Sequence, residues 1–215
     1  MPKPARSREE IDQFKKEILD AALEILYKEG FFNLSMRKLA KKTGMTAANI
    51  YNYFACKDEI YLAIQTRGFA RLANRFLEIE KKENNPVSTI KKMIRAYIEF
   101  GMKYPDQYEI MFTRNTPKFA DYVGTPLEPS ARIEKETALQ VAKIAQRVLS
   151  RIPMEEPGAE NAVITIWTAL HGLVSLANSR VLQEVEPDIN GVLNMIETIL
   201  MDIITPRIPD KSFSW

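Results

Sequence analysis

The chain has 215 residues, of which 46% are hydrophobic and 27% charged, and its formal net charge at pH 7 is +2. These values are typical of a folded globular protein and exclude a disordered or fibrous chain. A net charge this small gives no overall positive field, so affinity for nucleic acid has to come from a local group of residues.

Four helices are predicted in the first 82 residues. Over residues 11–27, apolar side chains recur every three or four positions, which indicates one face of an amphipathic helix. A very short helix follows the Gly44 turn, and Lys57 opens a long helix that runs towards residue 82. Residues suited to cap or end these helices separate them: Gly30, Ser35, Gly44 and Thr46.

The remainder of the chain is also predicted to be helical. The sequence ENNPVS over residues 83–88 indicates a linker, and an amphipathic helix then ends before Pro105, which suits the first turn of the next helix. Residues 113–130 contain three prolines and a glycine, which indicates a long loop with at most one turn of helix. Further helices are predicted over residues 131–152, 159–182 and 189–204.

Strand alternation is almost absent, so the predicted fold class is all-α. We expect an N-terminal three-helix helix-turn-helix domain within residues 1–58 and a C-terminal antiparallel helical bundle within residues 59–215.

The stretch TGMTAANIYNYFACKDE, residues 43–59, has the pattern of a helix-turn-helix whose second helix enters the DNA major groove. With Ile50 facing inward, a step of about 100° per residue places three others near the inward side: Thr46, Tyr53 and Phe54. The outward side and its flanks then carry Ala48, Asn49, Tyr51 and Asn52.

The outward residues have the chemistry that DNA contact requires. Asn49 and Asn52 carry amides that can make two hydrogen bonds to an adenine edge, and Ala48 is small enough for close backbone approach. Lys57 lies at a helix start, where its charge is unfavourable for the helix dipole unless an anionic partner is near. The alternative is structural: tyrosines packed on neighbouring helices and lysines on a solvated face.

The spacing of Gly44, Tyr51, Phe54 and Lys57 favours DNA binding over that alternative. Residues 11–62 resemble the DNA-binding domain of TetR-type (tetracycline-repressor-like) transcriptional regulators. The matching residues are Gly30, Phe31, Ser35, Arg37, Leu39, Ala40, Gly44, Met45, Thr46, Ile50, Tyr51, Tyr53, Phe54, Lys57, Asp58 and Leu62.

The resemblance implies phosphate contacts at Tyr51 and Lys57, and a recognition helix that faces the major groove. Ala47 has little to read a base with, so base reading falls mainly on Asn49 and Asn52. The full set of predicted DNA-contacting residues is Arg37, Thr46, Ala47, Ala48, Asn49, Tyr51, Asn52, Tyr53 and Lys57. Further candidate phosphate partners are Lys38, Lys41, Lys42, Lys3, Arg6 and Arg8.

Two apolar helices near the C-terminus predict a homodimer. A twofold dimer on two half-sites is the usual route from one helix-turn-helix to useful specificity. Residues 159–182 are apolar on more than one face and residues 189–204 carry an apolar stripe, so both need burial. TetR-like proteins dimerise through their last two long helices, which implies a homodimer through these ranges. The alternative is a monomeric bundle that buries the same stripes.

The sequence IWTALHGLVSL, residues 166–176, resembles the Trp-His-Gly signature of one subclass of TetR-like C-terminal domains, which often has a stretch like YEIMF, residues 108–112. In such domains the helical core holds an effector, and a small hydrophobic or aromatic one is implied here. The candidate lining residues are Tyr97, Phe100, Met102, Tyr108, Met111, Phe112, Trp167 and His171. The simpler interpretation of His171 is a buried, hydrogen-bonded histidine.

The predicted function is a homodimeric transcriptional regulator, a repressor released from a palindromic double-stranded operator by a small-molecule effector. The alternative is an effector-independent architectural or division-linked DNA-binding protein of the same fold. No enzyme, cofactor or metal site is expected, because His171 is the only histidine and lacks a neighbouring acid in sequence.

A cytoplasmic protein without a membrane segment is expected. The N-terminal sequence lacks the apolar run of a signal peptide, and polar residues interrupt the most apolar stretch, residues 162–182. The lone cysteine, Cys56, excludes an internal disulfide and fits a reducing compartment; a redox-sensing role for it is the lesser alternative to a structural one.

Overall fold

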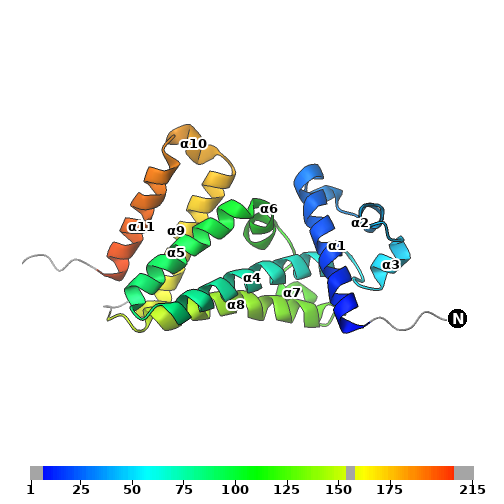
Figure 1. Ribbon diagram of the computed structural model, residues 1–215, viewed down its shortest axis with the longest axis horizontal. Coiled ribbons are helices and arrows are strands. Elements are labelled where there is room, and N and C mark those ends of the chain that lie inside the picture. The colour runs from blue at the N-terminus through cyan, green and yellow to red at the C-terminus, as the bar shows by residue number, and fades with distance from the viewer. Residues whose placement is uncertain (1–6, 154–157, 206–215) are drawn as a thin grey trace, which may run out of the picture. The chain divides into compact units, whose positions relative to one another are not determined.

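The computed structural model describes residues 7–153 and 158–205, and every regular element in these ranges is helical (Figure 1). This confirms the predicted all-α class. In chain order the elements are α1 (Arg8–Glu29), η1 (Phe31–Asn33), α2 (Met36–Thr43), α3 (Ala47–Tyr51), α4 (Lys57–Lys82), α5 (Pro86–Lys103), α6 (Pro105–Tyr108), η2 (Glu109–Thr113), α7 (Phe119–Tyr122), α8 (Glu128–Leu149), α9 (Gly158–Asn178), α10 (Val181–Val185) and α11 (Ile189–Ile204).

The chain forms two compact units. Unit 1 comprises Met1–Phe69 and Asp106–Glu136, and unit 2 comprises Ala70–Pro105 and Thr137–Trp215. Both α4 and α8 contribute residues to each unit. The predicted boundary between residues 58 and 59 divides the chain by function, and the compact units divide it elsewhere. As a functional boundary it stays a prediction.

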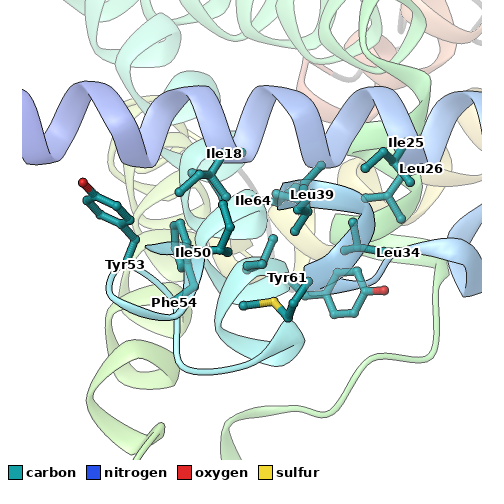
Figure 2. Packing of buried hydrophobic residues seen from close by; sticks show 14 of the residues in the cluster. Ile18, Ile25, Leu26, Leu34, Leu39, Ile50, Tyr53, Phe54, Tyr61 and Ile64 are labelled. Atoms are coloured by element: carbon teal, nitrogen blue, oxygen red, sulfur yellow. The ribbon is translucent and has the colours of Figure 1, made fainter. Parts of the chain in front are cut away.

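A hydrophobic core holds the first four helices of unit 1 together. Figure 2 shows side chains of α1, among them Ile18, facing Leu39 of α2, Ile50 of α3 and Ile64 of α4. All four side chains are fully buried. Burial of a side chain of this size contributes roughly 1.5–3 kcal/mol, so this core fixes the short α3 against the longer helices.

Local sequence explains where the predicted boundaries differ from the structure. The predicted linker over residues 83–88 is shorter, because the Asn85 side chain caps α5 by accepting from the Ser88 N–H at 3.0 Å. Pro86 then occupies the first turn, where its missing N–H costs nothing. The predicted loop over residues 113–130 contains α7, and α8 begins within it at Glu128.

The predicted helix over residues 159–182 is interrupted. α9 ends at Asn178, and Arg180 adopts a left-handed backbone conformation with φ of 65° before α10 begins. A left-handed residue breaks the helical hydrogen-bond ladder, and α10 therefore links α9 to α11 as a separate turn of helix. Among the residues described, none of the helices combines the length and apolar character that a membrane crossing requires.

In unit 2, an ion pair fastens α11 to α5. The Glu197 carboxylate accepts hydrogen bonds from Arg95, with an Nη2–Oε1 distance of 3.0 Å, and its Oε1 lies 3.2 Å from Lys91 Nζ. The Glu197 side chain is only 10% exposed. Burial raises the pKa of Glu197, but the hydrogen bonds and charges of Arg95 and Lys91 outweigh burial and hold the pKa below its usual value.

Replacing Glu197 with glutamine is expected to lower the free energy of unfolding at pH 7 by about 1–3 kcal/mol. Because the pKa is lower in the folded state, the ion pair stabilises the protein above the unfolded pKa of about 4.3. That contribution is lost as the pH falls through the folded value. Urea unfolding of wild type and variant at pH 7 and pH 3 measures the difference. The control is Glu184→Gln on α10, an exposed acid. A difference as large at pH 3 as at pH 7 would rule out the ion pair as its source.

Candidate nucleic-acid interface

Local capping shapes the turn between α2 and α3. The Ser35 hydroxyl accepts from the Lys38 N–H at 3.2 Å and starts α2, and Gly44 ends α2 in the left-handed conformation with φ of 67°. The Thr46 hydroxyl then accepts from the Asn49 N–H at 3.1 Å and starts α3. These caps place two helices in contact across a turn of three residues, which is the geometry of a helix-turn-helix.

The predicted register of α3 is confirmed on its inward side. Ile50, Tyr53 and Phe54 are all buried, with exposed fractions of 0%, 7% and 3%. Thr46 differs from the prediction, because its side chain is exposed. A capping residue has non-helical backbone angles, so a step of 100° per residue does not describe its direction.

The outward side of α3 is accessible to a partner. The predicted DNA-contacting residues that are exposed are Arg37, Thr46, Ala48, Tyr51, Asn52 and Lys57, and Ala47 and Asn49 are partly exposed. Tyr51 is 53% exposed, which is unusual for a large aromatic side chain that has a core beside it. A row of amides, a phenol and a lysine therefore faces away from the core of unit 1, as a DNA-reading helix requires.

Tyr53 is the one predicted contact that is buried. Its ring packs on Phe14 of α1, with the centroids 5.8 Å apart. Figure 2 shows its hydroxyl at the edge of the core. The ring therefore positions α3 against α1, and a DNA contact by Tyr53 stays a prediction.

Acidic residues of α1 hold two of the candidate phosphate-binding lysines on α2. Lys42 Nζ lies 2.7 Å from Glu24 Oε1, and Lys38 Nζ lies 2.6 Å from Glu29 Oε2. Hydrogen bonds from Lys28 and Lys42 lower the pKa of Glu24 to about 2. Lys38 and Lys42 thus have protein partners before any phosphate arrives. Sequence reasoning missed this pairing, because the four-residue spacing of Glu24 and Lys28 indicates only the pair within α1 and not the partners on α2.

The other candidate phosphate partners differ in their surroundings. Arg37, Lys41 and Arg8 are exposed. Lys3 and Arg6 lie outside the described residues.

The predicted effector-pocket residues divide between the two units. In unit 1, Tyr108 and Met111 are buried, and the Phe112 ring contacts Tyr108 and Phe69 with centroid distances of 4.8 and 5.3 Å. These three residues therefore form part of an aromatic core around the first half of α4. Their role in a pocket stays a prediction.

In unit 2, the candidates occupy different environments. Tyr97 and Phe100 of α5 are buried, whereas Met102 is 38% exposed and Trp167 of α9 is 46% exposed. His171 is partly buried one turn from Trp167, and burial lowers its pKa, which favours the neutral imidazole at pH 7. A role in effector binding stays a prediction for these residues too.

The last two long helices expose apolar side chains. On α9, Ile164 and Trp167 are 51% and 46% exposed, and on α11 the residues Met195, Ile199 and Ile203, spaced four apart, are 44–54% exposed. We call these five residues the apolar face. Large apolar side chains that stay exposed at helical spacing are candidates for an interaction surface.

Two profiles of known families match the chain. Residues 18–64 match "Bacterial regulatory proteins, tetR family", and residues 90–196 match "Tetracyclin repressor-like, C-terminal domain". The first range contains the second half of α1, α2, α3 and the start of α4, and the second contains most of α5, α6 to α10 and the first half of α11. Both matches confirm the predicted resemblance, and the Trp-His-Gly subclass stays a prediction.

Two curated relatives illustrate the range of similar proteins. The HTH-type transcriptional regulator RutR of Escherichia coli (strain K12) is 23% identical over 202 residues, which cover 90% of this chain and 91% of RutR. The nucleoid occlusion factor SlmA of Actinobacillus pleuropneumoniae serotype 5b (strain L20) is 26% identical over 105 residues, which cover 48% of this chain and 52% of SlmA.

Solved structures share the fold at lower identity. A protein of unknown function from Rhodococcus sp. RHA1 aligns with a TM-score of 0.72 and 18% identity over 94% of this chain and 97% of that one. The transcriptional regulator FadR from Bacillus subtilis, solved in complex with stearoyl-CoA, aligns with a TM-score of 0.68 and 16% identity over 87% of this chain and 98% of FadR. The recognition helix is capped and faces outward, and family profiles match both halves of the chain. The chain therefore belongs to the TetR family of DNA-binding transcriptional regulators and, as predicted, is not an enzyme.

Proposed function

We propose that the protein is a homodimeric repressor that binds a palindromic operator and leaves it when a small molecule binds the C-terminal helices. The outward side of α3 supports operator recognition, since it presents Asn49, Tyr51 and Asn52 beside the exposed Lys57. One such helix reads only a few base pairs, so a second copy has to supply the other half-site.

The proposed dimer rests on the apolar face. Its five side chains lie on α9 and α11, which contact each other within unit 2. Two copies related by a twofold axis would bury these residues against their own equivalents in a four-helix bundle. The arrangement removes apolar side chains from water without any change inside unit 2.

Selection of bound duplexes from a random pool tests this proposal. We expect enrichment of an inverted repeat, because a twofold dimer presents two identical recognition helices in opposite orientations. Enrichment of a single half-site, or of no sequence, would contradict the palindromic operator.

The proposed effector is an apolar or aromatic molecule with a polar end. FadR of Bacillus subtilis, which shares the fold, was solved with stearoyl-CoA. In this chain, aromatic residues and methionines occur in both units near α4 and α5, and methionine adapts to ligands of varied shape.

Thermal denaturation with defined probes tests for an effector. We expect a cognate probe at 100 times its Kd to stabilise the protein by about 2.7 kcal/mol, which raises Tm by roughly 5–10 °C in a chain of this size. The probes are acyl-CoAs of increasing chain length and aromatic acids, with coenzyme A as the control that lacks the apolar part. A probe that raises Tm should also release the selected duplex. If no probe changes either, the effector part of the proposal loses its support.

A second function is favoured by one comparison. SlmA, which is similar over about half of this chain, is named as a nucleoid occlusion factor. An effector-independent protein of that kind would bind its duplex equally well with every probe and would bind many genomic sites. Mapping of bound sites in cells separates this candidate from a repressor with few operators.

A further inference from the structure

Unit 1 contains more than the helix-turn-helix. The segment Asp106–Glu136 joins residues of α1 to α4 in the same compact unit. We call Asp106–Glu136 the brace. It includes most of α6, the π-helical turn η2, α7 and the beginning of α8.

Two buried glutamines fix the brace on α4. Gln65 of α4 donates to the Ile110 carbonyl at 3.0 Å and to the Thr116 hydroxyl at 3.1 Å. In the opposite direction, Gln107 of α6 donates to the Ile64 carbonyl at 3.1 Å. Both glutamines are 3% exposed. A buried amide that lost its partner would be costly, so these bonds define a single register between α4 and the brace.

Close packing reinforces that register. A Cβ on Gly68 would lie 2.2 Å from Met111 Sδ, so the Met111 side chain fills the space that the missing Cβ leaves on α4. Ile110, also in η2, is 2% exposed and belongs to the hydrophobic core of the first four helices. The core that positions α3 is therefore completed by the brace.

One arm of the brace reaches the turn between α1 and α2. The Arg114 guanidinium lies over the Phe31 ring, 5.4 Å from its centroid, and its Nη2 lies 2.8 Å from Glu109 Oε1. Phe31 in turn stacks on Tyr61 of α4 with centroids 4.9 Å apart. A cation over an aromatic face is attracted to it, so Arg114 holds this turn just ahead of the α2 cap.

The other arm reaches the start of α4. Tyr122 of α7 is 6% exposed and packs on Leu62 of α4 and Ala131 of α8. Its hydroxyl interacts with Asp58, the neighbour of Lys57. Burial and nearby Asp58 raise the pKa of Tyr122 to about 12, so the hydroxyl remains a donor at physiological pH.

We propose that the brace aligns the helix-turn-helix for operator binding, with Arg114 and Tyr122 as its two positioning residues. Arg114 sets the turn before α2, and Tyr122 sets the start of α4 beside Lys57. This inference deepens the proposed function and rests on it for the operator. Neither residue touches DNA in this scheme; each acts through Phe31 or Asp58.

The double variant Arg114→Gln, Tyr122→Phe tests the brace in two ways. In the free protein, hydrogen exchange of amides in residues 31–36 and 55–60 is expected to accelerate about tenfold, because the Arg114–Phe31 cation–π contact and the Tyr122–Asp58 interaction are lost. On the selected duplex, affinity is expected to fall about tenfold with an unchanged salt slope, since no phosphate contact is lost.

Matched variants complete the experiment. Two control variants lack groups outside the two arms of the brace. Lys135→Gln removes a cation that lies over Phe119, and Tyr104→Phe removes a hydroxyl in unit 2. Neither should change hydrogen exchange in α1 to α4. Arg114→Lys, which keeps a cation over Phe31, should restore most of the Arg114 effect. Unchanged exchange in the double variant would overturn the brace, even if wild type selected no duplex. A salt slope lowered by about 1 would instead make Arg114 a phosphate contact and overturn its positioning role.

Discussion

Replacing Trp167 or Ile199 of the apolar face with aspartate is expected to convert the protein into a monomer at micromolar concentration. A carboxylate buried without a partner costs several kcal/mol, and the twofold axis places each substitution in the interface twice. The dimerisation constant should therefore fall at least ~1,000-fold, equivalent to about 4 kcal/mol. Affinity for the selected operator should fall with it, because the second half-site is no longer bound by a linked copy.

Sedimentation velocity at micromolar protein measures the oligomeric state directly. Trp167 and Ile199 are about half exposed in unit 2, so aspartate there leaves the fold of the subunit intact, which circular dichroism verifies. The matched control is Leu77→Asp on α4, an exposed leucine outside the apolar face. A wild-type monomer, or dimeric Trp167→Asp and Ile199→Asp variants, would refute the interface.

Substitutions on the outward side of α3 are expected to separate sequence reading from phosphate contact. Asn52→Ala should weaken the selected duplex roughly 5- to 150-fold, the range of 1–3 kcal/mol for a bidentate base contact, and relax the preference at one position of each half-site. Lys57→Ala and Tyr51→Phe should weaken all duplexes alike. Lys57→Ala should also lower the salt slope by about 1 for each half-site.

Fluorescence anisotropy across a salt series measures these effects, and repeated selection with Asn52→Ala measures the base preference. Lys82→Ala, at the exposed end of α4 in unit 2, is the control for a general loss of positive charge. If Asn52, Lys57 and Tyr51 were all dispensable for binding, the outward side of α3 would not be the DNA interface.

Most helices were predictable because their determinants are local. The apolar spacing within residues 189–204 predicts α11 at its observed bounds, and Ser35, Gly44 and Thr46 cap the helices that they were expected to cap. The short α3 follows from the same residues. Capping and periodicity depend on neighbours within one or two turns, so a single sequence contains them.

The elements that the sequence did not reveal depend on distant partners. The π-helical turn η2 over Glu109–Thr113 packs where Gln65, more than 40 positions earlier, donates to its Ile110 carbonyl. The break at Arg180 requires a backbone conformation that arginine disfavours by itself. Neither has a local pattern that predicts it.

The candidate interface shows the same division. The inward side of α3 followed from helical spacing, whereas the pairing of Lys38 and Lys42 with acids of α1 depends on how α1 and α2 pack. The lining of an effector pocket is harder still to predict, because its candidate residues lie far apart in sequence and belong to both units. Residue type alone does not determine which of them share a cavity.

The presence of Ile110 in the core of the first four helices has a consequence for biosynthesis. The ribosome releases α1, α2 and α3 well before it adds this isoleucine. The new helix-turn-helix therefore leaves the ribosome with part of its apolar core uncovered. The order of translation therefore differs from the order of core formation: the core of unit 1 is completed only after residues 70–105 of unit 2 and then Ile110 have been added.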